Sequence, residues 1–257
     1  MSATATDWNP EAYARFRGLR LRPAVDLLAQ VGELPEGDIV DLGCGDGAVA
    51  PLLRARLPGR RLIGVDASPA MLEKASGYEA RIEADVAGWL PERPPALIFS
   101  NAALHWLGDH AGLLPRLARA LAPGGVLAVQ MPRQFFAPSH RFLRDIAQTM
   151  FPDRFDFAHY QPPVAAPVDY ALMLGGLGQL DVWETDYIQR LAPDGTGHPV
   201  RAFTAATAMR PIAAKLDEAE LAAFTRAYDR ALAAAYPLAA DGAVLMPFRR
   251  LFFVLKV

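Results

Sequence analysis

The sequence predicts an α/β protein built on a parallel sheet that is covered by helices on both faces. Short apolar runs alternate with helical patterns from about residue 37 to residue 132, a pattern typical of parallel strands joined by right-handed crossovers. The 257 residues are 52% hydrophobic and 21% charged, which is enough to form the core of a globular domain. We therefore expect one domain over residues 1–257.

The first elements follow one another closely. Residues 9–31 are expected to form a helix, because apolar residues recur there at a spacing of three. After Gly37 the run IVDL reads as a short buried strand, and the helix AVAPLLRARL follows a glycine-rich turn. The run RLIGVD is a second strand that ends at Asp66, and Ser68 is expected to cap a helix that begins at Pro69.

The later elements complete the sheet. RIEADV and ALIFSNAALHWL are read as the third and fourth strands, AGLLPRLARALA as a helix and VLAVQMP as the fifth strand. Beyond Pro132 helices and loops outside the sheet are expected over residues 135–180 and 190–240, with the strand VWETDYIQRL between them and RLFFVLKV as a final buried strand within 245–257. An apolar stripe with helical spacing predicts core packing by Leu221, Phe224, Tyr228, Leu232 and Tyr236.

Charge and cysteine content limit the possible partners. The 26 Lys and Arg residues nearly balance the 28 Asp and Glu residues, so no overall field favours nucleic acid or an anionic membrane. No basic segment precedes an apolar core at the start, and no run of 18 apolar residues occurs, so we expect a cytoplasmic protein. Cys44 is the only cysteine, and His105 and His110 are five apart, so neither a disulfide nor a metal site is expected.

The run VDLGCGDG at residues 40–47 raises the question of the cofactor. Its glycine spacing, with Gly43, Gly45 and Ala48, also fits the dinucleotide fingerprint. A dinucleotide would bring two negative phosphates close to Asp41, whereas S-adenosylmethionine carries an ammonium and a sulfonium that a carboxylate attracts. Asp41 therefore favours S-adenosylmethionine, although it could instead cap a loop or pair with an arginine.

Three further strand ends carry candidate ligand groups. Asp66 can accept hydrogen bonds from both ribose hydroxyls, an interaction that dehydrogenases also use. Asp85 can accept from an adenine amino group beside the backbone of Val86, or it can be an exposed loop residue. The fourth strand ends near Asn101 and Ala102, at the switch point where open parallel sheets bind ligands.

These motifs together resemble a known family. DLGCGDG, GVDASPAML, EADV, SNAALHW and LAPGGVLAVQMP, in this order over residues 37–132, resemble the motifs of class I S-adenosylmethionine-dependent methyltransferases. The flanks DWNPEAYARFRGLRLRPAVDLL, TAATAMRP and YPLAADGAVLMPFRRLFFV resemble the trans-aconitate 2-methyltransferase family. The resemblance implies a Rossmann-like sheet of seven strands with the last antiparallel, and a helical substrate cap.

The family methylates a carboxylate of trans-aconitate and releases the monomethyl ester and S-adenosylhomocysteine. By resemblance, residues 1–32 would form a helical lid that includes Tyr13 and Arg20, over a cofactor-binding core at 33–134. The cofactor would be lined by Asp41, Gly43, Gly45, Asp66, Ala67, Met71, Asp85, Val86, Asn101 and Ala102.

The substrate half departs from the family pattern. In the late motif Thr207, Arg210 and Pro211 remain, while four other positions are replaced by Phe203, Thr204, Ala206 and Met209. A carboxylate is already ionised near neutral pH, so methylation needs positioning and exclusion of water rather than a strong base. Candidates for holding a small polycarboxylic acid are Tyr170, Arg210, Arg249 and Arg250, with Arg20 and Arg133 as further arginines. Arg210, in the retained part of the motif, is the first choice among them, although each arginine could instead be a solvated surface residue.

His105 and Trp106 are candidates for the wall of the methyl-transfer site, although Trp106 could be a packing aromatic and His105 a bystander. Three alternative functions stay open at this point. They are methyl transfer to another small molecule, a nicotinamide-dependent oxidoreductase, and a non-catalytic protein that binds S-adenosylmethionine. We expect a monomer that binds neither nucleic acid nor membrane.

Overall fold

The computed structural model describes residues 17–257, with side chains described from residue 21 onward. The chain divides into two compact units. The sheet unit consists of Arg20–Arg133, Pro163–Thr185 and Arg249–Val257, and the helical unit includes Gln134–Pro162 and Asp186–Phe248. The segment expected outside the sheet at 135–180 is therefore divided, because residues from Pro163 onward belong with the sheet.

The strands form one mixed sheet, as predicted. Its order is β3-β2-β1-β4-β5-β7-β6. The strands are β1 Ile39–Leu42, β2 Leu62–Asp66, β3 Ala80–Glu83, β4 Leu97–Asn101, β5 Val126–Pro132, β6 Gln179–Leu191 and β7 Val244–Lys256. Strands β1 to β5 pair in parallel, and β7 pairs antiparallel to β5. The seven expected strands and the reversed direction of the last one are confirmed.

Two strands end earlier than the sequence suggested. The third strand ends at Glu83 and not at Asp85, because the Asp85 side chain accepts a hydrogen bond from the Ala87 N–H at 2.9 Å and so stabilises a turn. The fourth ends at Asn101, since Ala102 has a positive φ of 55° that no strand continues. A short 3₁₀ helix, η1 Leu104–Trp106, follows it.

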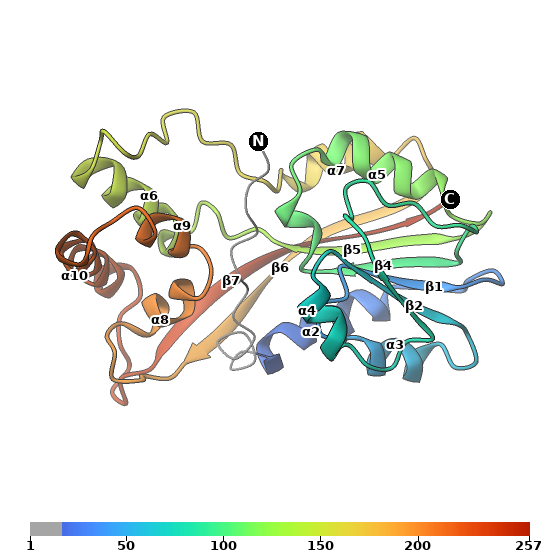
Figure 1. Cartoon of the computed structure of the whole chain (residues 1–257), viewed down its shortest axis with the longest axis horizontal. Coiled ribbons are helices and arrows are strands. Elements are labelled where there is room, and N and C mark those ends of the chain that lie inside the picture. Colours follow the sequence, from blue (N-terminus) through green and yellow to red (C-terminus); the bar gives the residue numbers. More distant parts are fainter. Residues whose placement is uncertain (1–16) are drawn as a thin grey trace. The chain divides into compact units, whose positions relative to one another are not determined.

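Helices cover both faces of the sheet within the sheet unit. Figure 1 shows α5 (His110–Arg119) and α7 (Pro167–Leu174) on one side, and α2 (Arg17–Ala29), α3 (Ala50–Arg56) and α4 (Pro69–Lys74) on the other. Consecutive β7 residues point to opposite faces: Phe253 stacks on Tyr170 of α7, whereas Phe252 stacks on Trp183 of β6. Strands β1, β4 and β5 are mostly apolar and almost wholly buried, as expected of parallel strands that are covered on both faces.

The capping prediction at α4 is confirmed. Ser68 has an extended backbone, and its hydroxyl accepts a hydrogen bond from the Met71 N–H at 3.4 Å while Pro69 occupies the first turn. The helix predicted over residues 9–31 is described only from Arg17 and ends at Ala29.

The helical unit has its own core. Its helices are α6 Pro138–Met150, α8 Pro199–Ala205, α9 Arg210–Ala213 and α10 Glu218–Ala235. Phe224, Tyr228 and Leu232 of α10 are fully buried, and they share the core with Leu143 and Ala147 of α6. The apolar stripe predicted from the sequence is therefore confirmed as packing.

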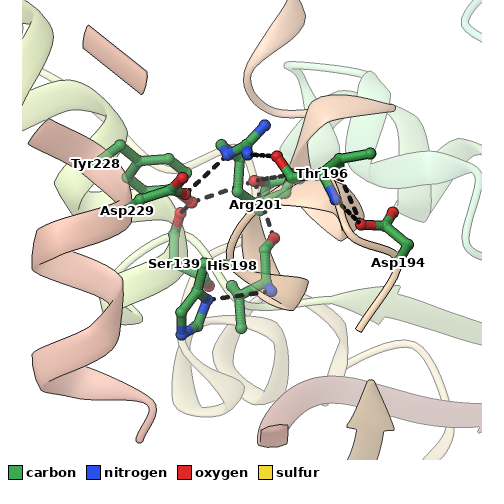
Figure 2. A network of polar contacts seen from close by, with 9 residues as sticks. Ser139, Asp194, Thr196, His198, Arg201, Tyr228 and Asp229 are labelled. Carbon is green, nitrogen blue, oxygen red and sulfur yellow. Dashed lines mark hydrogen bonds and ion pairs between the residues drawn. The ribbon is translucent and has the colours of Figure 1, made fainter. Parts of the chain in front are cut away.

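A polar network stabilises this helical core (Figure 2). The Tyr228 hydroxyl donates to the Ser139 carbonyl at 2.5 Å, and Arg201 Nε donates to Asp229 at 2.7 Å. His198 Nδ1 accepts from the Val200 N–H at 3.3 Å. These bonds satisfy buried polar groups between α6, α8 and α10. A second arginine of the unit, Arg190, forms an ion pair with Asp241 at the surface.

No helix from Arg17 to Val257 is long and apolar enough to span a bilayer. The same residues contain no group of three or more His, Cys, Asp or Glu side chains that could hold a metal ion.

Candidate active site

The turn after β1 depends on glycine for its shape. Gly43 and Gly45 have φ values of +77° and +55°, which side chains rarely adopt. A Cβ atom on Gly43 would also overlap with the Cβ of Ala103 in the segment after β4. Gly43 therefore lets the turn after β1 lie directly against Ala103 in the segment after β4, at the carboxyl ends of the central strands.

Asp66, at the end of β2, holds this turn in place. Its two oxygens accept hydrogen bonds from the Gly45 N–H at 2.8 Å and from the Ser68 N–H at 2.9 Å. A carboxylate offers about four acceptor positions, so capacity remains for a ligand hydroxyl. The side chain is half-buried and thus open to one side.

Asp41 is enclosed under the same turn. It is 1% exposed, and the Tyr78 hydroxyl donates a hydrogen bond to its Oδ2 at 2.6 Å. Burial raises the pKa of Asp41 to about 7, the hydrogen bond from Tyr78 opposes this, and the charge of Asp66 adds to it. The partner of Asp41 is thus a tyrosine and not an arginine.

Other predicted cofactor residues follow β2 and β3. The methyl group of Met71 lies 3.8 Å from the position that a Cβ on Gly45 would occupy. Ala67 is exposed beside Asp66, while Asp85 is exposed and Val86 is buried in the turn after β3. Tyr13 lies outside the described residues, as does the side chain of Arg20.

The end of β4 carries unusual groups. The Asn101 side-chain oxygen is buried and has no hydrogen-bond partner among the described residues. Ala102 adopts its positive φ while its N–H donates to the Gln130 carbonyl at 2.9 Å. Backbone held in such a conformation is common at functional sites. A buried acceptor without a partner is open to a polar ligand.

His105 and Trp106 follow on η1. Their rings are 4.6 Å apart, and Trp106 is 62% exposed, so it is not a core aromatic. Burial lowers the pKa of His105 to about 3, with the charges of Arg250 and His110 acting in the same direction. His105 is therefore neutral at physiological pH.

Arg250 lies at the carboxyl end of β5, where it pairs with Pro132. It is 3% exposed, and its Nη1 donates to the Gln130 side-chain oxygen at 3.3 Å. Gln130 is fully buried, and its amide nitrogen has no partner within the described part of the chain. Sequence reasoning missed Gln130, although one amide in the apolar strand VLAVQMP is a signal, because buried polar side chains need a reason.

The remaining substrate candidates have different surroundings. Arg133 donates to Glu184 at 2.8 Å and to the Ala165 carbonyl at 2.8 Å, so it is tied into the sheet unit. Tyr170 is fully buried, and its hydroxyl is bonded to His110 at 2.7 Å. This placement assigns Tyr170 to the core rather than to a ligand surface. Arg249 is exposed, and Arg210 begins α9 in the helical unit.

Comparison with known proteins identifies the family. A model described as "Methyltransferase domain" matches residues 13–166. The chain is 42% identical over 261 residues to a trans-aconitate 2-methyltransferase of Methylobacterium radiotolerans, covering 97% of this chain and 98% of the relative. It is 44% identical to the protein of that name from Methylobacterium nodulans, with the same coverage. The chain belongs to the trans-aconitate 2-methyltransferase family. It is therefore a methyltransferase.

Solved structures share the fold at low sequence identity. The YcgJ protein from Bacillus subtilis aligns with a TM-score of 0.57 and 17% identity, over 92% of this chain and 98% of that one. A putative methyltransferase from Bacillus halodurans aligns with a TM-score of 0.53 and 14% identity, over 90% and 98%. These likenesses confirm the class I methyltransferase fold that the motifs predicted.

Proposed function

We propose that this enzyme transfers a methyl group from S-adenosylmethionine to a carboxylate of trans-aconitate or a similar small polycarboxylic acid, giving a monomethyl ester and S-adenosylhomocysteine. The observation that carries this proposal is the 42% and 44% identity, over 97% of the chain, to relatives that are named for trans-aconitate. The chemistry of the residues in the sheet unit supports it independently.

The residues around the glycine turn fit a cationic cofactor. Asp41 and Asp66 interact electrostatically, and the field of a buried carboxylate is poorly screened. Two acids at this point repel a pyrophosphate and attract an ammonium or a sulfonium, which argues against a nicotinamide cofactor. Asp66 retains acceptor capacity for ribose hydroxyls, and Asn101 offers its unpartnered oxygen. S-adenosylmethionine supplies, when bound, a methyl group activated by its positively charged sulfur.

The reaction needs little acid or base catalysis from the protein. An ionised carboxylate oxygen of the substrate forms the new bond to the methyl carbon, while the carbon–sulfur bond breaks and its electron pair stays on sulfur. No proton is transferred, and the opposite charges of the two reactants are neutralised. The protein's contribution is to hold the acceptor in line and to exclude water.

Arg250 is the best-placed residue of the sheet unit for an anionic substrate. Its guanidinium can bind a carboxylate through two parallel hydrogen bonds, and Gln130 fixes one of its nitrogens. His105 is neutral beside it and so adds no second charge. We assign Arg249 as a further candidate contact for another carboxylate, with His105 and Trp106 as wall residues. Arg210, in the helical unit, stays a predicted substrate contact.

The altered late motif is compatible with the same acceptor. Phe203 and Met209 are less than 9% exposed, and Thr204 is fully buried with its hydroxyl bonded to the Val200 carbonyl at 3.1 Å. Three of the four changed positions are thus core residues of the helical unit. Their replacement alters packing there, which weakens the case for a different acceptor.

The direct test is incubation with methyl-labelled S-adenosylmethionine and trans-aconitate, followed by measurement of base-labile label in the acid. Ester formation is expected. Binding of S-adenosylhomocysteine without ester formation would mean that the acceptor is another molecule. Binding of NADH, with no binding of S-adenosylmethionine or S-adenosylhomocysteine, would overturn the proposal.

A matched pair of variants tests the role of Arg250. Arg250→Lys keeps the charge but loses the bidentate geometry, and we expect KM for the acid to rise by about tenfold or more while S-adenosylhomocysteine affinity is unchanged. Arg61→Lys, in a surface pair with Asp38 at 3.2 Å, is the control and should leave both unchanged. An unaltered KM in Arg250→Lys would remove Arg250 from the substrate site.

A further inference from the structure

Tyr78 lies between α4 and β3, and its side chain contacts three parts of the sheet unit. Its hydroxyl donates to Asp41 on β1 at 2.6 Å. Its ring atoms lie 3.1 Å from the position that a Cβ on Gly64 would occupy in β2, and 3.2 Å from the corresponding position at Gly47. A side chain at either position would crowd the ring, so the two glycines let it pack closely against β2 and the glycine turn.

We propose that Tyr78 is a positioning residue of the cofactor site: its ring supports the glycine turn, and its hydroxyl holds the enclosed Asp41 as a carboxylate whose charge attracts a cationic ligand. Nothing in the motif sequence points to it, since Tyr78 lies outside the glycine-rich run and outside both flanking strands. The proposal rests on the assignment of S-adenosylmethionine as the cofactor.

The sign of the effect follows from the groups that face Asp41. They are Asp66 from β2, Tyr78 from the segment before β3 and Cys44 from the glycine turn, while the β4 residue opposite Asp41 is the apolar Phe99. Asp66 and burial favour the protonated acid, and the Tyr78 hydroxyl is the group that favours the carboxylate. Removing the hydroxyl should raise the pKa of Asp41, so that at neutral pH less of the protein carries the charge that attracts the cofactor.

The test compares the wild type with Tyr78→Phe, which keeps the ring and loses only the hydroxyl. Calorimetric titration with S-adenosylmethionine from pH 6 to pH 9 gives the dissociation constant of each protein. The ratio of the variant's constant to that of the wild type is independent of the ligand's own protonation, because this affects both proteins equally. A hydrogen bond to an ionised group shifts an equilibrium by about tenfold or more. We expect a penalty of about tenfold at pH 6 that falls toward one at pH 9. A penalty that is the same at every pH would mean that the tyrosine acts only through packing, and would overturn the proposal.

A ligand-free measurement separates this inference from the proposed function. The carboxyl ¹³C signal of Asp41, identified by its loss in Asp41→Asn, should titrate near pH 7 in the wild type and at a higher pH in Tyr78→Phe. Equal midpoints would overturn the role of Tyr78 even if S-adenosylmethionine binds. A shifted midpoint in a protein that binds no S-adenosylmethionine at any pH would instead retain the contact and refute the cofactor assignment.

Discussion

Replacing Asp41 by Asn should stabilise the ligand-free protein while it weakens cofactor binding. The folded protein holds the pKa of Asp41 at about 7, compared with an ordinary value of 3.8. An acid with a raised pKa costs no stability below its unfolded value, and the cost grows as pH rises from 3.8 to about 7. Above both values the difference corresponds to about 4 kcal/mol.

The amide removes this cost because it carries no charge, and its oxygen can still accept from Tyr78. We expect the free energy of unfolding at pH 8 to increase by about 2 to 4 kcal/mol, since the substitution loses some packing and polar contacts of its own. Near pH 4 the gain should disappear. Urea unfolding followed by circular dichroism at both pH values measures the difference.

Asp66→Asn is the matched control, with the same chemical change at the end of the neighbouring strand. Both oxygens of Asp66 accept backbone N–H groups, so an amide nitrogen would face one of these donors, and we expect a loss of about 1 to 3 kcal/mol. Both variants should bind S-adenosylmethionine more weakly. If Asp41→Asn destabilises the protein at pH 8, or if its effect is the same at pH 4, the description of Asp41 as a costly buried acid is refuted.

Three further variants test other parts of the structure. Gly43→Ala should cost about 1 to 3 kcal/mol more than Gly59→Ala in urea unfolding, because both share a φ of +77° but only Gly43 would overlap a neighbour; equal losses would argue against the close approach. Arg201→Ala should lower the stability by about 1 to 3 kcal/mol, since it removes a largely buried ion pair, whereas the exposed Arg190→Ala should leave the unfolding midpoint nearly unchanged. His105→Gln should remove a loss of stability that develops as pH falls below 6.5, because the folded wild type resists protonation of His105 down to about 3; an unaltered pH profile of unfolding would place His105 in contact with water.

The order of strands and helices could be predicted because local patterns determine it. The run IVDL has no polar alternation, so it had to be buried on both faces, and Ser68 with Pro69 is a helix start that needs no tertiary contact. Strand ends were less predictable. The turn at Asp85 and the positive φ of Ala102 depend on single contacts, which hydrophobic periodicity does not record.

The proposed site divides in the same way. Asp41, Gly43 and Asp66 follow from a motif, because the chemistry of the ligand fixes their spacing along adjacent strands. Tyr78 and Gln130 do not follow from it, since each acts on a neighbour from a distant part of the sequence. Tyr170 shows the opposite case, because a polar aromatic that resembled a ligand contact is buried by the stacking of α7 on β7.

Among the proposed site residues, the acidic and the basic side chains lie at different places along the carboxyl edge of the sheet. The acids stand at the ends of β1 and β2, and the buried guanidinium of Arg250 lies beside the end of β5. Between them, the neutral Asn101 ends β4 and the neutral His105 follows it. This order suits the proposed pair of reactants, a methyl donor with a positive sulfur and an acceptor with negative carboxylates. Bringing the acids next to the arginine would let them pair with each other, and both reactants would then lose the charges that hold them. The central position of β4 therefore keeps the acids of β1 and β2 apart from Arg250. The positive sulfur of the donor and the negative carboxylate of the acceptor can then approach each other between them.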